Sequence, residues 1–94
     1  MKYKVFADDN YHYADEGERH KVGELRSAAA ALAAAGKVVD KYLETAYHRG
    51  MTADELYMSY TTFGEDPFIV TDDPNCKFSA WDYAKERCRE ICGP

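Results

Sequence analysis

Two pairs of adjacent aspartates are the residues whose type and position could most directly do chemistry. Asp8 and Asp9 follow one predicted strand, and Asp72 and Asp73 follow another. If folding brought these strand ends together, their carboxylates, together with His12, could hold a divalent cation or form an acid/base site. This predicts one alternative function, a small metal-dependent or acid/base enzyme. Turn chemistry explains both pairs with fewer assumptions, because aspartate is enriched where strands end in turns.

Three cysteines, Cys76, Cys88 and Cys92, could bind a metal or act as nucleophiles. Cys88 and Cys92 are one helical turn apart, but a structural zinc site needs four ligands, usually with one closely spaced pair. An odd, sparse set also does not fit the disulfide framework of a small secreted protein. We therefore expect free thiols in the core, a reducing compartment, and neither metal nor cofactor. A catalytic pairing with His12 or His48 stays open as an alternative.

Aromatic residues cluster in the segment that follows the first predicted strand, as Tyr11, His12 and Tyr13. Tyrosine combines a large contact area with a polar end, which suits partner-binding surfaces, and the chain has eight tyrosines. Most of them fit the edge of a core with solvated hydroxyls. Tyr11, His12 and Tyr13 are the best candidates for a partner-binding surface. The sequence has no phosphate-binding glycine loop, nucleophile elbow or EF-hand pattern.

The charge balance narrows the classes of partner. Twelve Lys and Arg against seventeen Asp and Glu give a net charge of −5. Phosphate binding needs clustered cations, so we expect no direct binding of nucleic acid. An acidic chain could instead mimic nucleic acid, which is a further alternative.

No apolar run is long enough to span a membrane, and Asp8 and Asp9 interrupt what could be a signal peptide. We expect a cytoplasmic protein that does not contact membranes.

Three short segments have the pattern of strands. Residues 2–8 alternate, with Tyr3, Val5 and Ala7 on one side. Residues 18–25 follow after a loop over 9–17 and form the second strand. Residues 68–71 are β-branched or aromatic and predict the third strand, after a turn that contains Glu65, Asp66 and Pro67.

Helix signals occupy most of the remaining chain. Ser27 is the expected N-cap of a helix over 28–47, and Thr52 with Glu55 forms a capping box at the start of a helix over 53–61. Ser79 begins the last helix. The expected apolar face of the middle helix is Leu56, Tyr57, Tyr60 and Phe63, and that of the last helix is Trp81, Ala84, Cys88, Ile91 and Cys92.

The order of these elements predicts one α+β domain over residues 1–94. Its order is ββααβα, with a small antiparallel three-stranded sheet and the helices packed on one face of that sheet. The runs MKYKVFADDNYHY, GMTADELYMSY, FGEDPFIV and FSAWDYAKERC resemble small uncharacterised bacterial proteins to which no activity is assigned. That resemblance implies a bacterial, cytosolic origin.

The leading functional hypothesis is a non-enzymatic protein-interaction module. Its surface would be the aromatic and acidic one around Tyr11, His12 and Tyr13, and it would bind a protein partner of unknown identity or a second copy of the chain. The enzyme would require convergent carboxylates in a pocket, and the nucleic-acid mimic would require a continuous negative stripe.

Overall fold

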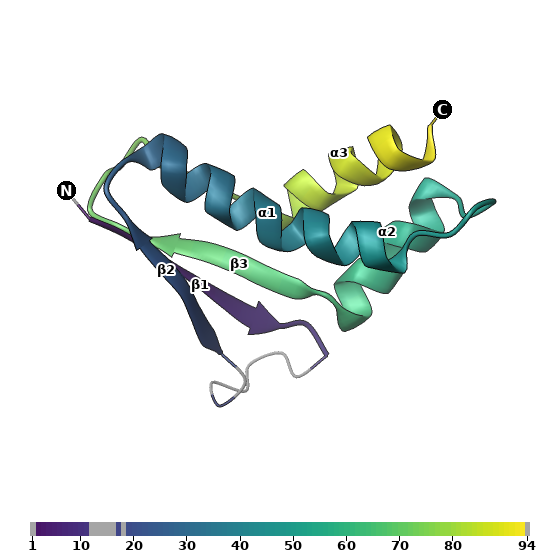
Figure 1. Cartoon of the computed structure of the whole chain (residues 1–94), viewed down its shortest axis with the longest axis horizontal. Helices are drawn as coiled ribbons and strands as arrows, with labels where there is room; N and C mark the ends of the chain where they lie inside the picture. Colours follow the sequence, from purple (N-terminus) through teal and green to yellow (C-terminus); the bar gives the residue numbers. More distant parts are fainter. Residues whose placement is uncertain (1, 12–16, 18, 94) are drawn as a thin grey trace.

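Three strands and three helices follow one another in the predicted order in a computed structural model, which describes residues 2–11, 17 and 19–93 (Figure 1). None of the described helices is both long and apolar enough to cross a membrane. The elements are β1 (Tyr3–Asp9), β2 (His20–Leu25), α1 (Ala28–Ala46), α2 (Ala53–Phe63), β3 (Glu65–Val70) and α3 (Ala80–Cys92). The predicted α+β class with an antiparallel sheet is confirmed.

The sheet has the strand order β2-β1-β3, and both neighbours run antiparallel to β1. Its register with β3 is regular, whereas the register with β2 shifts between Val5 and Phe6. Val5 is opposite Gly23 and Phe6 is opposite Lys21, so Val22 is the extra residue of a β-bulge. Gly23 therefore stands next to an irregularity of the edge strand.

The helices cover one face of the sheet. Tyr3, Val5 and Ala7 are buried on that face, as the alternation predicted. Tyr3 and Val5 form a core cluster with Ala31 and Ala35, which lie in the first half of α1. Their methyl side chains allow the helix backbone to come close to the sheet, because nothing larger stands between them.

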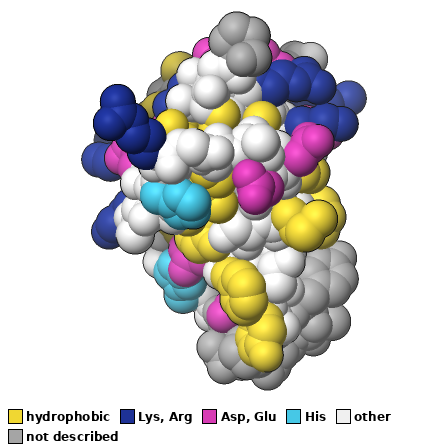
Figure 2. Space-filling view, turned by 90° about the vertical axis from the view of Figure 1, so that its right-hand side faces the viewer, with side chains coloured by type: hydrophobic (Ala, Val, Ile, Leu, Met, Phe, Trp, Pro, Cys, Tyr) yellow, Lys and Arg dark blue, Asp and Glu magenta, His cyan; other side chains and the backbone are white. Residues whose placement is uncertain are grey.

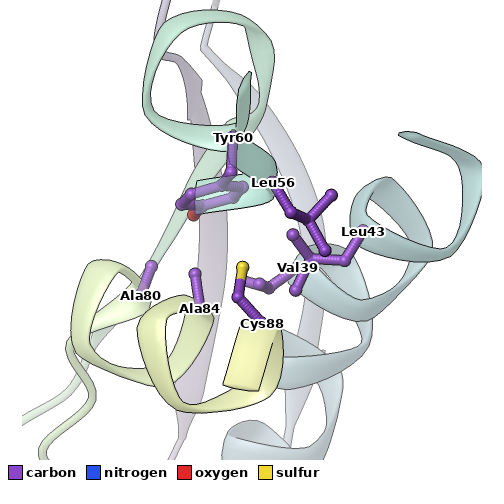
Figure 3. Packing of buried hydrophobic residues seen from close by; sticks show 7 residues of the cluster. All are labelled: Val39, Leu43, Leu56, Tyr60, Ala80, Ala84 and Cys88. Atoms are coloured by element: carbon purple, nitrogen blue, oxygen red, sulfur yellow. The ribbon is translucent and has the colours of Figure 1, made fainter. Parts of the chain in front are cut away.

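A second core lies between the three helices, beyond the sheet (Figure 3). Side chains from the second half of α1, from α2 and from α3 point toward one another there. They are Val39, Leu43, Leu56, Tyr60, Ala80, Ala84 and Cys88. Since α1 contributes to both cores, the molecule is elongated, with extents of 43 × 28 × 18 Å.

Several boundaries and faces differ from the prediction. β3 begins at Glu65, so the residues expected to form a turn, Glu65 to Pro67, pair with Asp9, Asp8 and Ala7. Proline is tolerated there because β3 is an edge strand.

Two large apolar residues that were expected on helix core faces are exposed. Trp81 is displaced from the core side of α3 because Ala80 occupies that position, and Phe63 ends α2 outside the cluster.

Gly36 of α1 lies against Tyr83 of α3. A Cβ at this position would stand 3.1 Å from both Cζ and Oη of Tyr83. The ring has little freedom to move, because its hydroxyl donates to Asp40 at 2.9 and 3.0 Å, and Arg87 donates to the same carboxylate at 2.9 Å. The neighbour that a larger residue at this position would meet is thus the Tyr83 side chain and not the backbone of α3.

We predict that Gly36→Ala lowers the stability of the fold. Overpacking costs about 1 to 3 kcal/mol and outweighs a helix-propensity gain of about 1 kcal/mol. Thermal unfolding monitored by circular dichroism measures the difference. In a Tyr83→Leu background the clash is absent, and the same substitution should then be stabilising. Stabilisation by Gly36→Ala in the otherwise unchanged chain would contradict this account.

Candidate partner-binding site

The two aspartate pairs lie at opposite ends of the sheet. Because β1 and β3 are antiparallel, Asp8 and Asp9 are at the end of β1 where β3 begins, whereas Asp72 and Asp73 follow the end of β3 beside Tyr3. A seven-residue strand separates them, which at about 3.3 Å per residue is roughly 20 Å. The fold does not bring the four carboxylates together.

Asp73 has a structural role in its turn. Its carboxylate accepts a hydrogen bond from the backbone N–H of Asn75 at 2.9 Å and another from the Tyr3 hydroxyl at 2.8 Å. These two hydrogen bonds hold the pKa of Asp73 below its ordinary value, and the bond from the Asn75 backbone has the larger effect. The turn thus ties the segment after β3 to the beginning of β1.

Asp8 belongs to a group of charged and aromatic side chains at the other end of the sheet, where β1 ends and β3 begins. Arg19 donates to its two oxygens at 2.6 and 3.2 Å, and the same guanidinium lies 5.0 Å from the centre of the Phe68 ring. Asp66 stands directly across from Asp8, and burial followed by the charge of Asp8 raises the pKa of Asp66. No cluster of His, Cys, Asp and Glu suited to a metal ion occurs among residues 2–11, 17 and 19–93.

The cysteine thiols are free, and the most buried of them belongs to the helical core. Burial, followed by the charge of Cys92, raises the pKa of Cys88 to about 11. A thiol in this environment is almost entirely protonated at neutral pH, so it is a weak nucleophile. The placement of Cys88 agrees with the core role predicted from its position on the helix.

Of the three predicted partner-binding residues, Tyr11 is within the described structure, and His12 and Tyr13 lie outside the described residues. The Tyr11 side chain is 63% exposed and stacks on Phe63, which is 61% exposed, with a centroid distance of 5.4 Å. Two large aromatic rings are therefore presented to solvent side by side, from segments far apart in the sequence. Figure 2 shows hydrophobic side chains exposed in the lower part of the view near acidic and histidine side chains, with the basic side chains farther up.

Asn10 holds this aromatic pair in place. Its backbone N–H donates to the carbonyl of Gly64 at 2.9 Å, and its side-chain amide donates to the carbonyl of Tyr60 at 2.9 Å. The residue is only 8% exposed, which is unusual for asparagine. Because both bonds go to the end of α2, the chain leaving β1 passes directly beside Phe63.

A groove of about 660 Å³ lies next to Phe63, between β2 and α1. Residues 20–22 of β2 form one wall, and Val38, Lys41 and Tyr42 of α1 form the other. Phe63 and Glu65 close one end. The Tyr42 hydroxyl contacts Ser59 Oγ at 2.7 Å and donates to the carbonyl of Ser59 at 3.1 Å, which fixes the ring in the wall.

The charges of the groove are uneven. Lys21 is paired with Glu24 at 2.6 Å, and the His20 Nε2 atom is 3.8 Å from a Glu65 carboxylate oxygen. Lys41 has no ion pair with any residue that the structure describes. A chain with a net charge of −5 thus carries a groove with an unneutralised lysine.

The outer edge of β2 runs along the same groove. β2 is a terminal strand of the sheet, and no described segment pairs with its outer side. Its backbone N–H and C=O groups on that side can therefore bind another strand. Val22, Val38 and Lys41 were not singled out by the sequence. The sequence feature that could have indicated them is the wide apolar face of α1. On that face Val38 and Tyr42 flank the core positions Val39 and Leu43.

Comparisons of this chain with protein-family models, with curated proteins and with solved structures give no significant match.

We predict that Asn10→Asp destabilises the fold by about 2 kcal/mol at neutral pH, because a buried carboxylate replaces the donor to the Tyr60 carbonyl. The folded state should raise the pKa of the new carboxyl group. The penalty is therefore complete above that pKa and decreases as the pH falls through it, when the protonated group can donate again. Urea unfolding at several pH values measures this. Asn75→Asp makes the same chemical change at an exposed position and should have little effect; equal losses at both sites would contradict the anchoring role.

Proposed function

We propose that this chain is a non-enzymatic protein-interaction module of the bacterial cytoplasm that binds an extended segment of a protein partner. The observation that carries the proposal is the groove between β2 and α1, which combines a free strand edge with apolar walls. The partner in this proposal is a protein and not a nucleic acid.

Strand addition at β2 provides the physical basis of binding. An extended segment beside an edge strand forms main-chain hydrogen bonds, and alternate side chains enter the adjoining groove. Val22, Val38 and Tyr42 offer apolar surface to these side chains. The stacked pair of Tyr11 and Phe63 lies where the groove ends and extends the apolar surface beyond it.

The charge of the groove favours a particular composition of the partner segment. Lys41 lacks an ion pair among the described residues, so a carboxylate at the corresponding position of the partner would gain a favourable interaction. The expected ligand is a short segment in which apolar residues alternate with Asp or Glu.

The two alternative functions have less support. The enzyme depended on convergence of Asp8, Asp9, Asp72 and Asp73, which the antiparallel register places at opposite ends of β1. The nucleic-acid mimic depended on a continuous negative stripe, whereas acidic and basic side chains are mixed on the face in Figure 2.

A peptide selection tests the proposal. Wild-type protein is used to select binders from a displayed library of random extended peptides, and the dissociation constant of the best peptide is then measured. We expect selected peptides to be acidic and apolar. Phe63→Ser should weaken binding about tenfold, because loss of a large aromatic anchor costs about 1 to 2 kcal/mol. Met58→Ser is the matched control, since Met58 is 69% exposed on the same helix but does not line the groove.

The contribution of charge is tested with a second pair of variants. Lys41→Glu should weaken peptide binding several-fold, and the loss should shrink as salt is added. Lys37→Glu, one turn earlier on the exposed side of α1, should leave binding unchanged. Failure to select any peptide, or equal effects of the groove and control variants, would remove the support for the groove as the binding site.

A further inference from the structure

The face of the sheet opposite the helices has no described helix or strand over it (Figure 1). Residues directly across from each other in a sheet point to the same face. Lys4, Phe6 and Asp8 of β1 therefore share this open face with Val70, Phe68 and Asp66 of β3. None of these six residues lines the groove between β2 and α1.

The centre of the open face is apolar. The Phe6 and Phe68 rings are stacked with centroids 5.8 Å apart, and Val70 beside them is 49% exposed. Neither phenylalanine is fully buried, although the Arg19 guanidinium that binds Asp8 lies 5.0 Å from the centre of the Phe68 ring. A solvated face of an antiparallel sheet normally carries polar residues at such positions. The aromatic pair makes this face a candidate surface for contact with another molecule.

The two ends of the open face carry opposite charge. At one end Lys4 is directly across from Val70, and Lys2 and Lys4 both lie near enough to Glu24 to lower its pKa, after the larger effect of Lys21. At the other end Asp8 and Asp66 are across from each other. Arg19 binds Asp8, whereas Asp66 has no ion pair within the part of the chain that the structure describes. Like charges directly opposite each other destabilise a sheet.

We propose that the open face is the interface of a homodimer. A two-fold axis that lies in the interface, perpendicular to β1, and passes through the aromatic pair brings Phe6 and Phe68 of one copy, with Arg19 beside Phe68, to the same group of the other. The same rotation lays β1 on β1 with reversed direction, so Lys4 of each copy faces the end of its partner that carries Asp8 and, one strand away, Asp66. Such an interface is self-complementary, because one surface supplies both the lysine and the carboxylate of two equivalent pairs. The lysine also relieves the repulsion between Asp8 and Asp66.

Charge reversal on two residues tests both the dimer and its orientation. In the Lys4→Glu variant both contacts become pairs of acids, and in the Asp66→Lys variant both become pairs of lysines. Sedimentation analysis over a wide concentration range should show a dimeric wild type and a dissociation constant at least about tenfold weaker for each variant alone. An equimolar mixture of the two variants should form a heterodimer close to the wild-type strength, because each mixed contact again joins opposite charges.

A double variant and two controls separate the interface from effects on folding. Lys4→Glu/Asp66→Lys within one chain restores both contacts and should recover the homodimer, even where Lys4→Glu is destabilised by its own cross-strand neighbour Glu24. Lys37→Glu and Glu44→Lys make the same changes on exposed positions of α1 and should leave the dimer intact. A monomeric wild type would overturn the proposal, and so would a dimer that neither the mixture nor the double variant restores.

Discussion

The close packing of α1 on β1 is the constraint from which the other features follow. Ala31 and Ala35 bring the first half of the helix onto Tyr3 and Val5, where no large side chain holds the two elements apart. The second half leaves β2 and packs on α2 and α3 (Figure 1). Since one straight helix serves both cores, part of the sheet edge is left without helical cover. The groove occupies that place, and its walls are fixed by the same contacts that stabilise the fold.

Polar contacts between distant segments then set the positions of the exposed residues. The Asp40 carboxylate accepts hydrogen bonds from the Tyr83 hydroxyl and the Arg87 guanidinium. These bonds join α1 to α3 beside Gly36. Asn10 joins the end of β1 to the end of α2, and this bond places Tyr11 against Phe63. The partner surface and the core are thus parts of one arrangement, in which the exposed Tyr11 directly follows the buried polar anchor Asn10.

Local signals in the sequence predicted the elements well because their causes are local. The Thr52 and Glu55 capping box forms as expected, and the alternation of β1 gives its buried side directly. Glu65 and Asp66 were misassigned to a turn because their strand structure depends on pairing with Asp9 and Asp8, which are far away in the chain. The groove and the charged ends of the open face depend on strand order in the same way. Composition alone could not have indicated them.

Pro67 has a consequence for how the sheet can grow. It lies in β3, the second edge strand, where a proline nitrogen has no hydrogen to donate. The two edges of the sheet are therefore unequal, since β2 can accept an added strand more readily than β3 can. A molecule with two equally receptive edges can polymerise, because each added copy offers a new edge to the next. Addition of a strand at β3 would lack the main-chain hydrogen bond that Pro67 cannot donate, so growth from both edges of the sheet is less favourable than addition at β2 alone.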